Sequence, residues 1–224
     1  MPPTLLLFTD VLAPLRHGRG LIATIARAFD DVVIADGAAV AVCVRMKQAD
    51  DAAVAAVCVA LRNILAPANV SVFVHDRPQL VGPLHLQGAQ LSSSATAHEV
   101  RLARLKMPAH AVLGLSAHPT SQAPLCVRND VEYCTWSPVF SPSSKADARA
   151  PLGLEALRGH RTPIVALGGI DVDTAAACLA AGACGVAVIG AVLGAAKPDA
   201  ALRGLLRACA IEHRRRRGAV RRAA

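Results

Sequence analysis

The segment from Pro163 to Gly190 constrains the fold of this chain more than any other stretch. Two apolar runs of strand length, Ile164–Leu167 and Gly185–Ile189, flank an Ala-rich run, Val172–Ala181. Neither apolar run alternates with polar residues, which is typical of parallel strands that are buried on both faces. Aspartates and a threonine, which are good helix-start residues, stand at the beginning of the Ala-rich run. The segment therefore predicts a β-loop-α-β unit.

The same alternation of strand-like and helix-like stretches runs through the rest of the chain. The other expected strands are Thr4–Phe8, a strand ending at Val42–Arg45, Val70–Val74, Leu84–Leu86, Ala111–Leu115 and Glu132–Trp136. The other expected helices are Gly20–Phe29, Asp50–Leu65, Thr96–Leu105, Leu152–Arg158 and Asp199–Ile211. Eight strands joined by helices in 224 residues, with no G-x-G-x-x-G after the first strand, favour a single (β/α)8 TIM barrel of parallel strands over an open doubly wound sheet. We expect this α/β barrel to cover residues 1–212 and a basic, disordered tail to cover residues 213–224.

The net charge of +8 is concentrated in that tail. Six arginines lie between Arg214 and Arg222, so the rest of the chain carries 8 − 6 = +2. No aromatic residue is interleaved with them to stack bases, so a solvated tail is favoured over a nucleic-acid site. No apolar run approaches the roughly 20 residues that cross a bilayer, and the N-terminus lacks the basic region of a signal peptide. We expect a cytoplasmic protein with no membrane partner, and a homodimer is left open.

The seven cysteines show no C-x-x-C spacing, and their number is odd. This pattern favours buried free thiols over disulfides or a zinc site. Cys43 is the candidate exception among these thiols, because it lies near the end of an expected strand.

Polar residues gather where the expected strands end. In a barrel all these carboxyl ends converge on one face, where barrel enzymes carry their active sites. Three cations, several hydroxyls and a Gly-Gly pair on one rim predict a pocket for phosphate or diphosphate. Asp76 could bind magnesium there, while Gly168-Gly169 alone fits either a phosphate site or a tight turn. The polar set is Asp10, Arg45, Lys47, His75, Asp76, Arg77, Gln87, Gln90, Ser116, His118, Ser143, Ser144, Lys145, Gly168 and Gly169.

Several short motifs add a resemblance to a known family. They are Thr9-Asp10, Val44-Arg45-Met46-Lys47, Val74-His75-Asp76-Arg77, Leu84-His85-Leu86, Gly114-Leu115-Ser116-Ala117-His118, Ser137-Pro138-Val139-Phe140 through Ser144-Lys145, and Val165-Ala166-Leu167-Gly168-Gly169-Ile170. In this order and spacing, the chain from Leu5 to about Leu193 resembles thiamine phosphate synthase and its relative, the thiazole tautomerase TenI. The family implies a (β/α)8 barrel. Its synthases join hydroxymethylpyrimidine diphosphate to thiazole phosphate and release diphosphate, with magnesium present.

The resemblance also implies roles for individual residues. Arg45, Lys47, Ser144 and Lys145 would hold the diphosphate, and Asp76 would bind magnesium. The candidate catalytic residues are Lys145, Ser116 beside the pyrimidine, and His118. The further candidate substrate-binding residues are His75 and, for the thiazole phosphate, Gly168, Gly169, Ile189 and Gly190.

The chain departs from the family pattern at four positions. Cys43 replaces a glutamine, His75 an asparagine and Pro142 a threonine, and Gln90 stands where the motif has a second acidic magnesium ligand. Losing one carboxylate weakens a magnesium site. We therefore favour a synthase with a degraded magnesium site over two alternatives. One is a tautomerase that uses His118 as its acid and base, and the other is a phosphate-binding barrel without catalysis.

Overall fold

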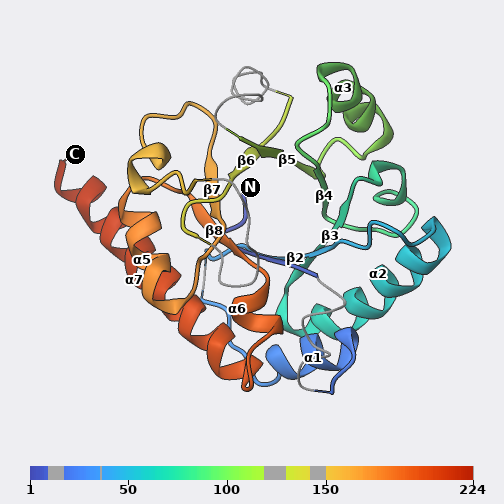
Figure 1. Ribbon diagram of the computed structural model, residues 1–224, viewed down its shortest axis with the longest axis horizontal. Helices are drawn as coiled ribbons and strands as arrows, with labels where there is room; N and C mark the ends of the chain where they lie inside the picture. The colour runs from blue at the N-terminus through green and yellow to red at the C-terminus, as the bar shows by residue number, and fades with distance from the viewer. Residues whose placement is uncertain (10–17, 36, 119–129, 142–149, 224) are drawn as a thin grey trace.

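Eight parallel strands form a closed barrel in chain order from β1 to β8 (Figure 1). The computed structural model describes residues 1–9, 18–35, 37–118, 130–141 and 150–223. Its strands are β1 (Leu5–Phe8), β2 (Val40–Val44), β3 (Ser71–His75), β4 (Gly88–Leu91), β5 (Val112–Ala117), β6 (Tyr133–Trp136), β7 (Ile164–Leu167) and β8 (Gly185–Val188). β8 closes the barrel by pairing with β1, where Val186 lies opposite Leu5. The predicted fold class is confirmed.

The helices lie around the outside of the barrel (Figure 1). They are α1 (Leu21–Ala28), α2 (Asp51–Leu65), α3 (Ala97–Lys106), α5 (Val172–Ala180), α6 (Gly190–Leu193) and α7 (Pro198–Ala223), with short 3-10 turns at η2 (Ala66–Ala68), η3 (Pro78–Leu80) and η4 (Leu154–Leu157). The first turns of α2 and α3 carry side-chain caps. The Asp50 carboxylate accepts from the Ala53 N–H at 2.8 Å, and Thr96 and Glu99 form a reciprocal capping box.

Alternation along the strands divides the core into two layers. Outward side chains such as Leu5 and Val42 pack beneath the helices, while inward ones such as Leu6 and Ala41 fill the barrel. Burying one leucine stabilises the fold by about 1.5–3 kcal/mol. The inner layer consists of Leu6, Phe8, Ala41, Cys43, Phe73, Tyr133, Val165 and Ala187.

Helix α2 and its continuation to Ala68 are long and apolar enough to cross a membrane, by length and composition alone. In the structure one face of this helix packs on the barrel. Val54, Cys58, Leu61 and Leu65 are each fully buried in the core cluster. This burial identifies α2 as a wall helix of the barrel.

The fourth strand was predicted too early in the chain. The segment Leu84–Leu86 is a turn, with His85 in the left-handed region at φ 51°, and β4 begins at Gly88. Leu86 is apolar because it is buried in the core beneath the helices, rather than because it belongs to a strand. The correction places Gln87 before β4, at the opposite end of the barrel from the predicted site, and Gln90 inside the strand.

Two further expectations differ from the structure. The closing helix was expected to end at Ile211, but α7 continues to Ala223. Arginine and alanine are good helix formers, which favours this extension. Cys134 on β6 is disulfide-bonded, so the expectation of free thiols throughout is wrong. Cys43, Cys58, Cys178 and Cys209 are free cysteines.

Candidate functional site

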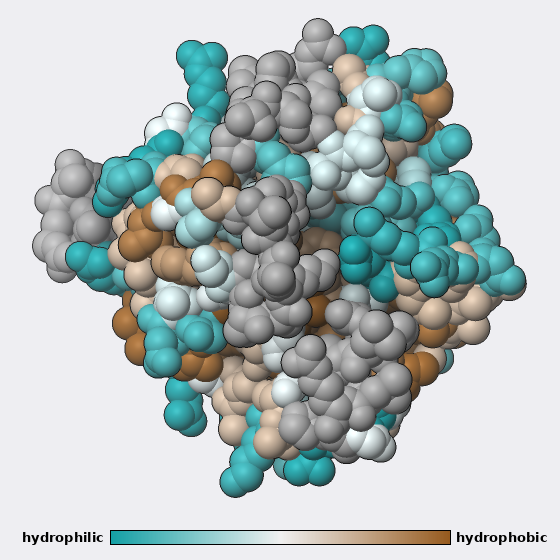
Figure 2. Space-filling view, in the orientation of Figure 1, coloured by the Kyte–Doolittle hydropathy of each residue, from teal (hydrophilic) through white to brown (hydrophobic). Residues whose placement is uncertain are grey.

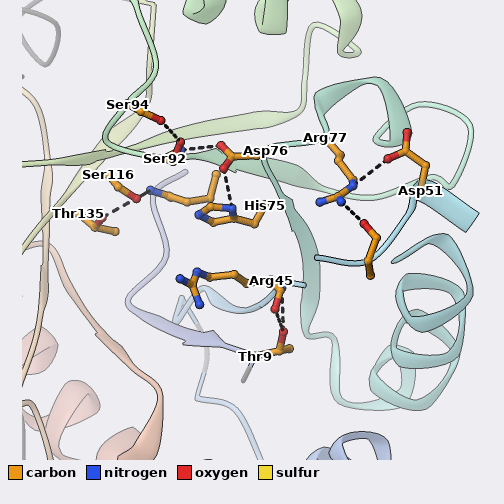
Figure 3. Close-up of polar contacts among 12 residues, drawn as sticks. Thr9, Arg45, Asp51, His75, Asp76, Arg77, Ser92, Ser94, Ser116 and Thr135 are labelled. Carbon is orange, nitrogen blue, oxygen red and sulfur yellow. Dashed lines mark hydrogen bonds and ion pairs between the residues drawn. The ribbon is translucent and has the colours of Figure 1, made fainter. Parts of the chain in front are cut away.

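Arg45 follows β2 at the carboxyl end of the barrel, and Thr9 fixes its backbone. The Arg45 N–H donates to Thr9 Oγ1 at 2.7 Å, and the Thr9 hydroxyl donates to the Arg45 carbonyl at 3.2 Å. Figure 3 shows the Arg45 guanidinium on the same side as the ring of His75. No acceptor for this guanidinium is found among the described residues, so it is available to an anion. Lys47 lies two residues further on and is exposed.

His75 and Asp76 form a hydrogen-bonded pair at the end of β3. His75 Nδ1 lies 3.0 Å from Asp76 Oδ2, and the Ser92 N–H donates to Asp76 Oδ1 at 2.7 Å. The imidazole is 5% exposed and meets the Phe8 ring edge-on at 6.3 Å. Burial raises the pKa of Asp76, but the bonds from His75 and Ser92 outweigh it and leave the pKa below its ordinary value. Asp76 is therefore a carboxylate at neutral pH.

Arg77 and Gln87 do not belong to the site, although both were among the predicted polar set. The Arg77 guanidinium turns away from Arg45 and donates to Asp51 Oδ1 at 2.8 Å and to the Ala49 carbonyl (Figure 3). It joins the loop after β3 to the start of α2. Gln87 is exposed and accepts from the Val72 N–H ahead of β4.

Cys43 points into the barrel and is fully buried. Burial raises the pKa of its thiol, Cys58 and Asp76 raise it further, and Arg45 only partly opposes them. The thiol therefore stays protonated at neutral pH, which makes it a poor nucleophile.

Gln90 lies inside the barrel between two hydroxyls. Its Nε2 donates to Ser116 Oγ at 3.0 Å and to Thr135 Oγ1 at 3.5 Å. Gln90 Oε1 and the hydroxyl of Tyr133 are both buried without a hydrogen-bond partner among the described residues. Burial raises the pKa of Tyr133 well above its ordinary value, so the phenol stays neutral.

Gly114 makes room for this arrangement. A Cβ on Gly114 would lie 2.3 Å from Gln90 Oε1 and 2.3 Å from Tyr133 Cζ. We expect Gly114→Ala to destabilise the protein by about 1–3 kcal/mol, because the amide and the phenol must both move. Chemical denaturation measures this loss. Gly20→Ala is the control, since a Cβ there meets nothing within 4 Å and should change the free energy of unfolding by about 1 kcal/mol or less. An equally small loss in Gly114→Ala would contradict the crowding argument.

The loops after β5, β6 and β7 are joined to one another. His118 Nδ1 lies 2.7 Å from the Ser137 carbonyl, and the Phe140 N–H donates to the Gly168 carbonyl at 3.0 Å. Gly168 has φ 98°, and a Cβ there would lie 2.7 Å from the Cα of Pro138. Gly169 has φ 64°, with the Ser141 carbonyl 2.8 Å from its missing Cβ. Both positions therefore require glycine, because the loop after β6 packs against them.

The first turn of α5, which follows the Gly168-Gly169 turn, is not open to an anion. The carboxylate of Asp171 accepts from the N–H groups of Asp173 and Thr174 at 3.1 and 3.0 Å. That carboxylate already satisfies the first turn. Gly190, after Ile189 on the neighbouring strand, is exposed and has nothing within 4 Å of its missing Cβ.

The structure thus brings Arg45, His75, Asp76, Ser116 and His118 to one rim, with Gly168, Gly169, Ile189 and Gly190 continuing it. In Figure 2, hydrophilic residues gather on the right of the view, over the region of β3, β4 and α3 in Figure 1. The predicted Asp10, Pro142, Ser143, Ser144 and Lys145 lie outside the described residues. Within the described ranges, no three His, Cys, Asp or Glu side chains group as metal ligands.

Two residues of the site, Thr135 and Ser92, were not predicted from the sequence. Thr135 accepts a hydrogen bond from Gln90, and the Ser92 N–H donates one to Asp76. Period-two alternation could have found Thr135, because Tyr133 and Thr135 both face inward while Cys134 and Trp136 face outward. Ser92 follows β4, so the early placement of that strand hid it.

Comparison with known proteins gives a consistent match. The profile of the family described as thiamine monophosphate synthase matches residues 18–192. The thiamine-phosphate synthase of Chloroflexus aurantiacus is 38% identical over 149 residues, which is 65% of this chain and 68% of the relative. That of Roseiflexus castenholzii is 34% identical over 205 residues, which is 86% of this chain and 89% of the relative.

Solved structures show the same fold. The thiamine phosphate pyrophosphorylase from Pyrococcus furiosus superposes with a TM-score of 0.75 at 24% identity, covering 93% of this chain and 96% of that one. The 3-hexulose-6-phosphate synthase from Salmonella typhimurium superposes with a TM-score of 0.67 at 15% identity, covering 94% and 100%.

Proposed function

This chain belongs to the thiamine monophosphate synthase family, and on that premise we propose that it joins hydroxymethylpyrimidine diphosphate to thiazole phosphate, forming thiamine phosphate and diphosphate. The observation that carries this proposal is the 34% identity to a thiamine-phosphate synthase over 86% of the chain. The rim of the barrel supports it, because the Arg45 guanidinium, which has no acceptor among the described residues, and the Ser116 hydroxyl lie at the same end of the barrel as the Gly168-Gly169 turn. The substrates would be small phosphorylated molecules.

The proposed roles follow the order of the strands. Arg45 and Lys47 hold the diphosphate, together with Ser144 and Lys145, and His75 is a further substrate-binding residue on the rim that carries Arg45. Ser116 contacts the pyrimidine. The backbone at Gly169 and Gly190 receives the thiazole phosphate, since Gly190 is open and the start of α5 is already capped.

The chemistry requires positioning more than a base. The bond between the pyrimidine methylene and the diphosphate oxygen breaks, and its electron pair leaves with the diphosphate. The resulting pyrimidine cation is captured by the lone pair of the thiazole nitrogen, so no proton has to be removed for the new C–N bond to form. Arg45 and Lys145 lower the barrier by stabilising negative charge on the leaving group. His118 has no required step.

The described residues supply too few oxygen ligands to bind magnesium by themselves. They fit magnesium if the diphosphate supplies further oxygen ligands. Asp76 offers one carboxylate, and both its oxygens already accept hydrogen bonds from His75 and Ser92. Magnesium prefers several oxygen ligands and keeps waters when few are supplied. We propose Asp76 as its protein ligand. The bound ion would supply positive charge to the leaving diphosphate.

The observed position of β4 supports a different position for the missing second carboxylate. The sequence analysis aligned the family motif with a strand ending at Leu86, but β4 ends at Leu91, five residues later. The same shift carries the acidic position of the motif from Gln90 to Ala95. Gln90 is fully buried inside the barrel, where a carboxylate would have to be desolvated. Ala95 lies just before the capped start of α3 and is partly exposed.

We therefore expect Ala95→Asp to lower the magnesium concentration for half-maximal activity by about tenfold, because it adds a second anionic ligand. Steady-state assays at varied magnesium give this constant. Gln90→Asp should instead destabilise the protein without this gain. A lower magnesium requirement in Gln90→Asp than in Ala95→Asp would refute the shifted alignment.

Complementation tests the proposed function in a cell. A bacterium that lacks its own thiamine-phosphate synthase should grow without added thiamine when it expresses this chain. The Arg45→Met variant, expressed to the same level, should not restore growth. No growth with the unmodified chain, despite soluble expression, would count against the proposal.

A further inference from the structure

An amide inside the barrel contacts the hydroxyl that the proposed function places beside the pyrimidine. Gln90 Nε2 donates to Ser116 Oγ at 3.0 Å and to Thr135 Oγ1 at 3.5 Å. Gln90 and Thr135 are fully buried, whereas Ser116 is partly exposed near the carboxyl end of β5. Ser116 therefore connects the barrel interior to the site at its rim.

The amide is not placed there to satisfy its own hydrogen bonds. Its oxygen is buried without a partner among the described residues, and so is the hydroxyl of Tyr133 beside it. A buried, unpaired polar atom costs stability, which a methionine of the same shape would avoid. What Gln90 provides, and methionine cannot, is the N–H that reaches Ser116.

This N–H determines which further hydrogen bonds the Ser116 hydroxyl can make. A hydroxyl has one proton to donate and two lone pairs to accept with. When one lone pair accepts from Gln90, the proton of Ser116 is left for another acceptor, and no described residue accepts it. The pyrimidine ring nitrogens are such acceptors.

We infer that Gln90 is a positioning residue that fixes the Ser116 hydroxyl as a hydrogen-bond donor toward the pyrimidine substrate. The inference rests on the proposed function, which supplies the substrate class. Gln90 itself does not touch the substrate and acts through Ser116.

The test is a pair of calorimetric titrations on Gln90→Met, with hydroxymethylpyrimidine diphosphate and with thiazole phosphate, each alone with magnesium so that no turnover occurs. The affinity for the pyrimidine should fall about fivefold, which is the size of one neutral hydrogen bond. The affinity for thiazole phosphate should stay within about twofold, and the thermal midpoint should not fall, since an unpaired buried oxygen has been removed. Gln87→Met is the matched control, because it changes the same residue type at the opposite end of the barrel and should alter neither affinity.

Combining the change with Ser116→Ala shows whether Gln90 acts through the serine. Ser116→Ala should weaken pyrimidine binding by about tenfold, and adding Gln90→Met should weaken it no further. Additive losses would overturn the inference. An unchanged pyrimidine affinity in Gln90→Met would also overturn it. So would a lower thermal unfolding midpoint together with weaker binding of both substrates, because that result is typical of a residue with only a structural role. Gln90→Leu repeats the test with a second apolar side chain.

These results separate the inference from the proposed function. If the unmodified protein does not bind the pyrimidine diphosphate, both fail. If it binds the pyrimidine with the expected dependence on Gln90 but forms no thiamine phosphate, only the proposed reaction fails.

Discussion

Replacing Arg45 with methionine is expected to lower kcat/KM for hydroxymethylpyrimidine diphosphate by about 10²–10³-fold, the loss seen when one preorganised donor to a developing anion is removed. The guanidinium lies on the same side as the ring of His75 (Figure 3) and has no acceptor among the described residues, so its charge is available to the diphosphate. The fold should be preserved, because the bonds to Thr9 come from the backbone of Arg45 and remain in the variant. Arg45→Lys should recover part of the rate, since it keeps the charge and loses the forked geometry.

Arg77→Met is the matched control for this prediction. The two arginines follow neighbouring strands, but Arg77 is bound to Asp51 and to the Ala49 carbonyl (Figure 3). Its loss should reduce stability by about 1 kcal/mol and change kcat/KM by less than about threefold. Steady-state kinetics and thermal denaturation of both variants give the comparison. A larger kinetic loss in Arg77→Met than in Arg45→Met would contradict the assignment of the diphosphate pocket.

The second large effect is expected at Lys145, and it separates the synthase from the tautomerase. Removing a cation that stabilises the leaving diphosphate should lower the rate of coupling by about 10²-fold or more. His118→Ala should lower it far less, because diphosphate departure needs no proton carrier. Both variants are assayed for coupling and for isomerisation of the thiazole, with circular dichroism to exclude unfolding.

A tautomerase would reverse that order. Its rate would depend on a proton carrier such as His118, and a lysine placed for diphosphate would matter little. His118 Nδ1 is already engaged with the Ser137 carbonyl, a contact that fixes the ring against the loop after β6. Coupling that survives Lys145→Ala and is lost in His118→Ala would refute the assigned roles.

The fold could be predicted because most of its strands are short apolar runs buried on both faces. Ile164–Leu167 is an example, and its predicted bounds match β7. β4 was not predicted because it lacks this apolar pattern. Its inward positions are Gly88 and Gln90, and neither residue type is typical of a strand. A search for apolar runs therefore favours the neighbouring turn, which carries leucines.

The location of the site could be predicted from the sequence, but the side-chain contacts within it could not. Converging strand ends brought Arg45, His75, Asp76 and Ser116 to one rim as expected. Arg77 shares the end of β3 with His75 and Asp76, but its partner lies on α2, a pairing that no local pattern reveals. The bond from Gln90 to Ser116 likewise joins residues 26 positions apart, and it depends on the space that Gly114 leaves open.

The most direct test of the central claim is the reaction itself. The purified chain is incubated with hydroxymethylpyrimidine diphosphate, thiazole phosphate and magnesium, and both products are quantified over time by mass spectrometry. We expect thiamine phosphate and diphosphate to form in equal amounts when both substrates are present, and no thiamine phosphate when either is omitted. Protein that is folded and binds both substrates but forms no thiamine phosphate would contradict the claim.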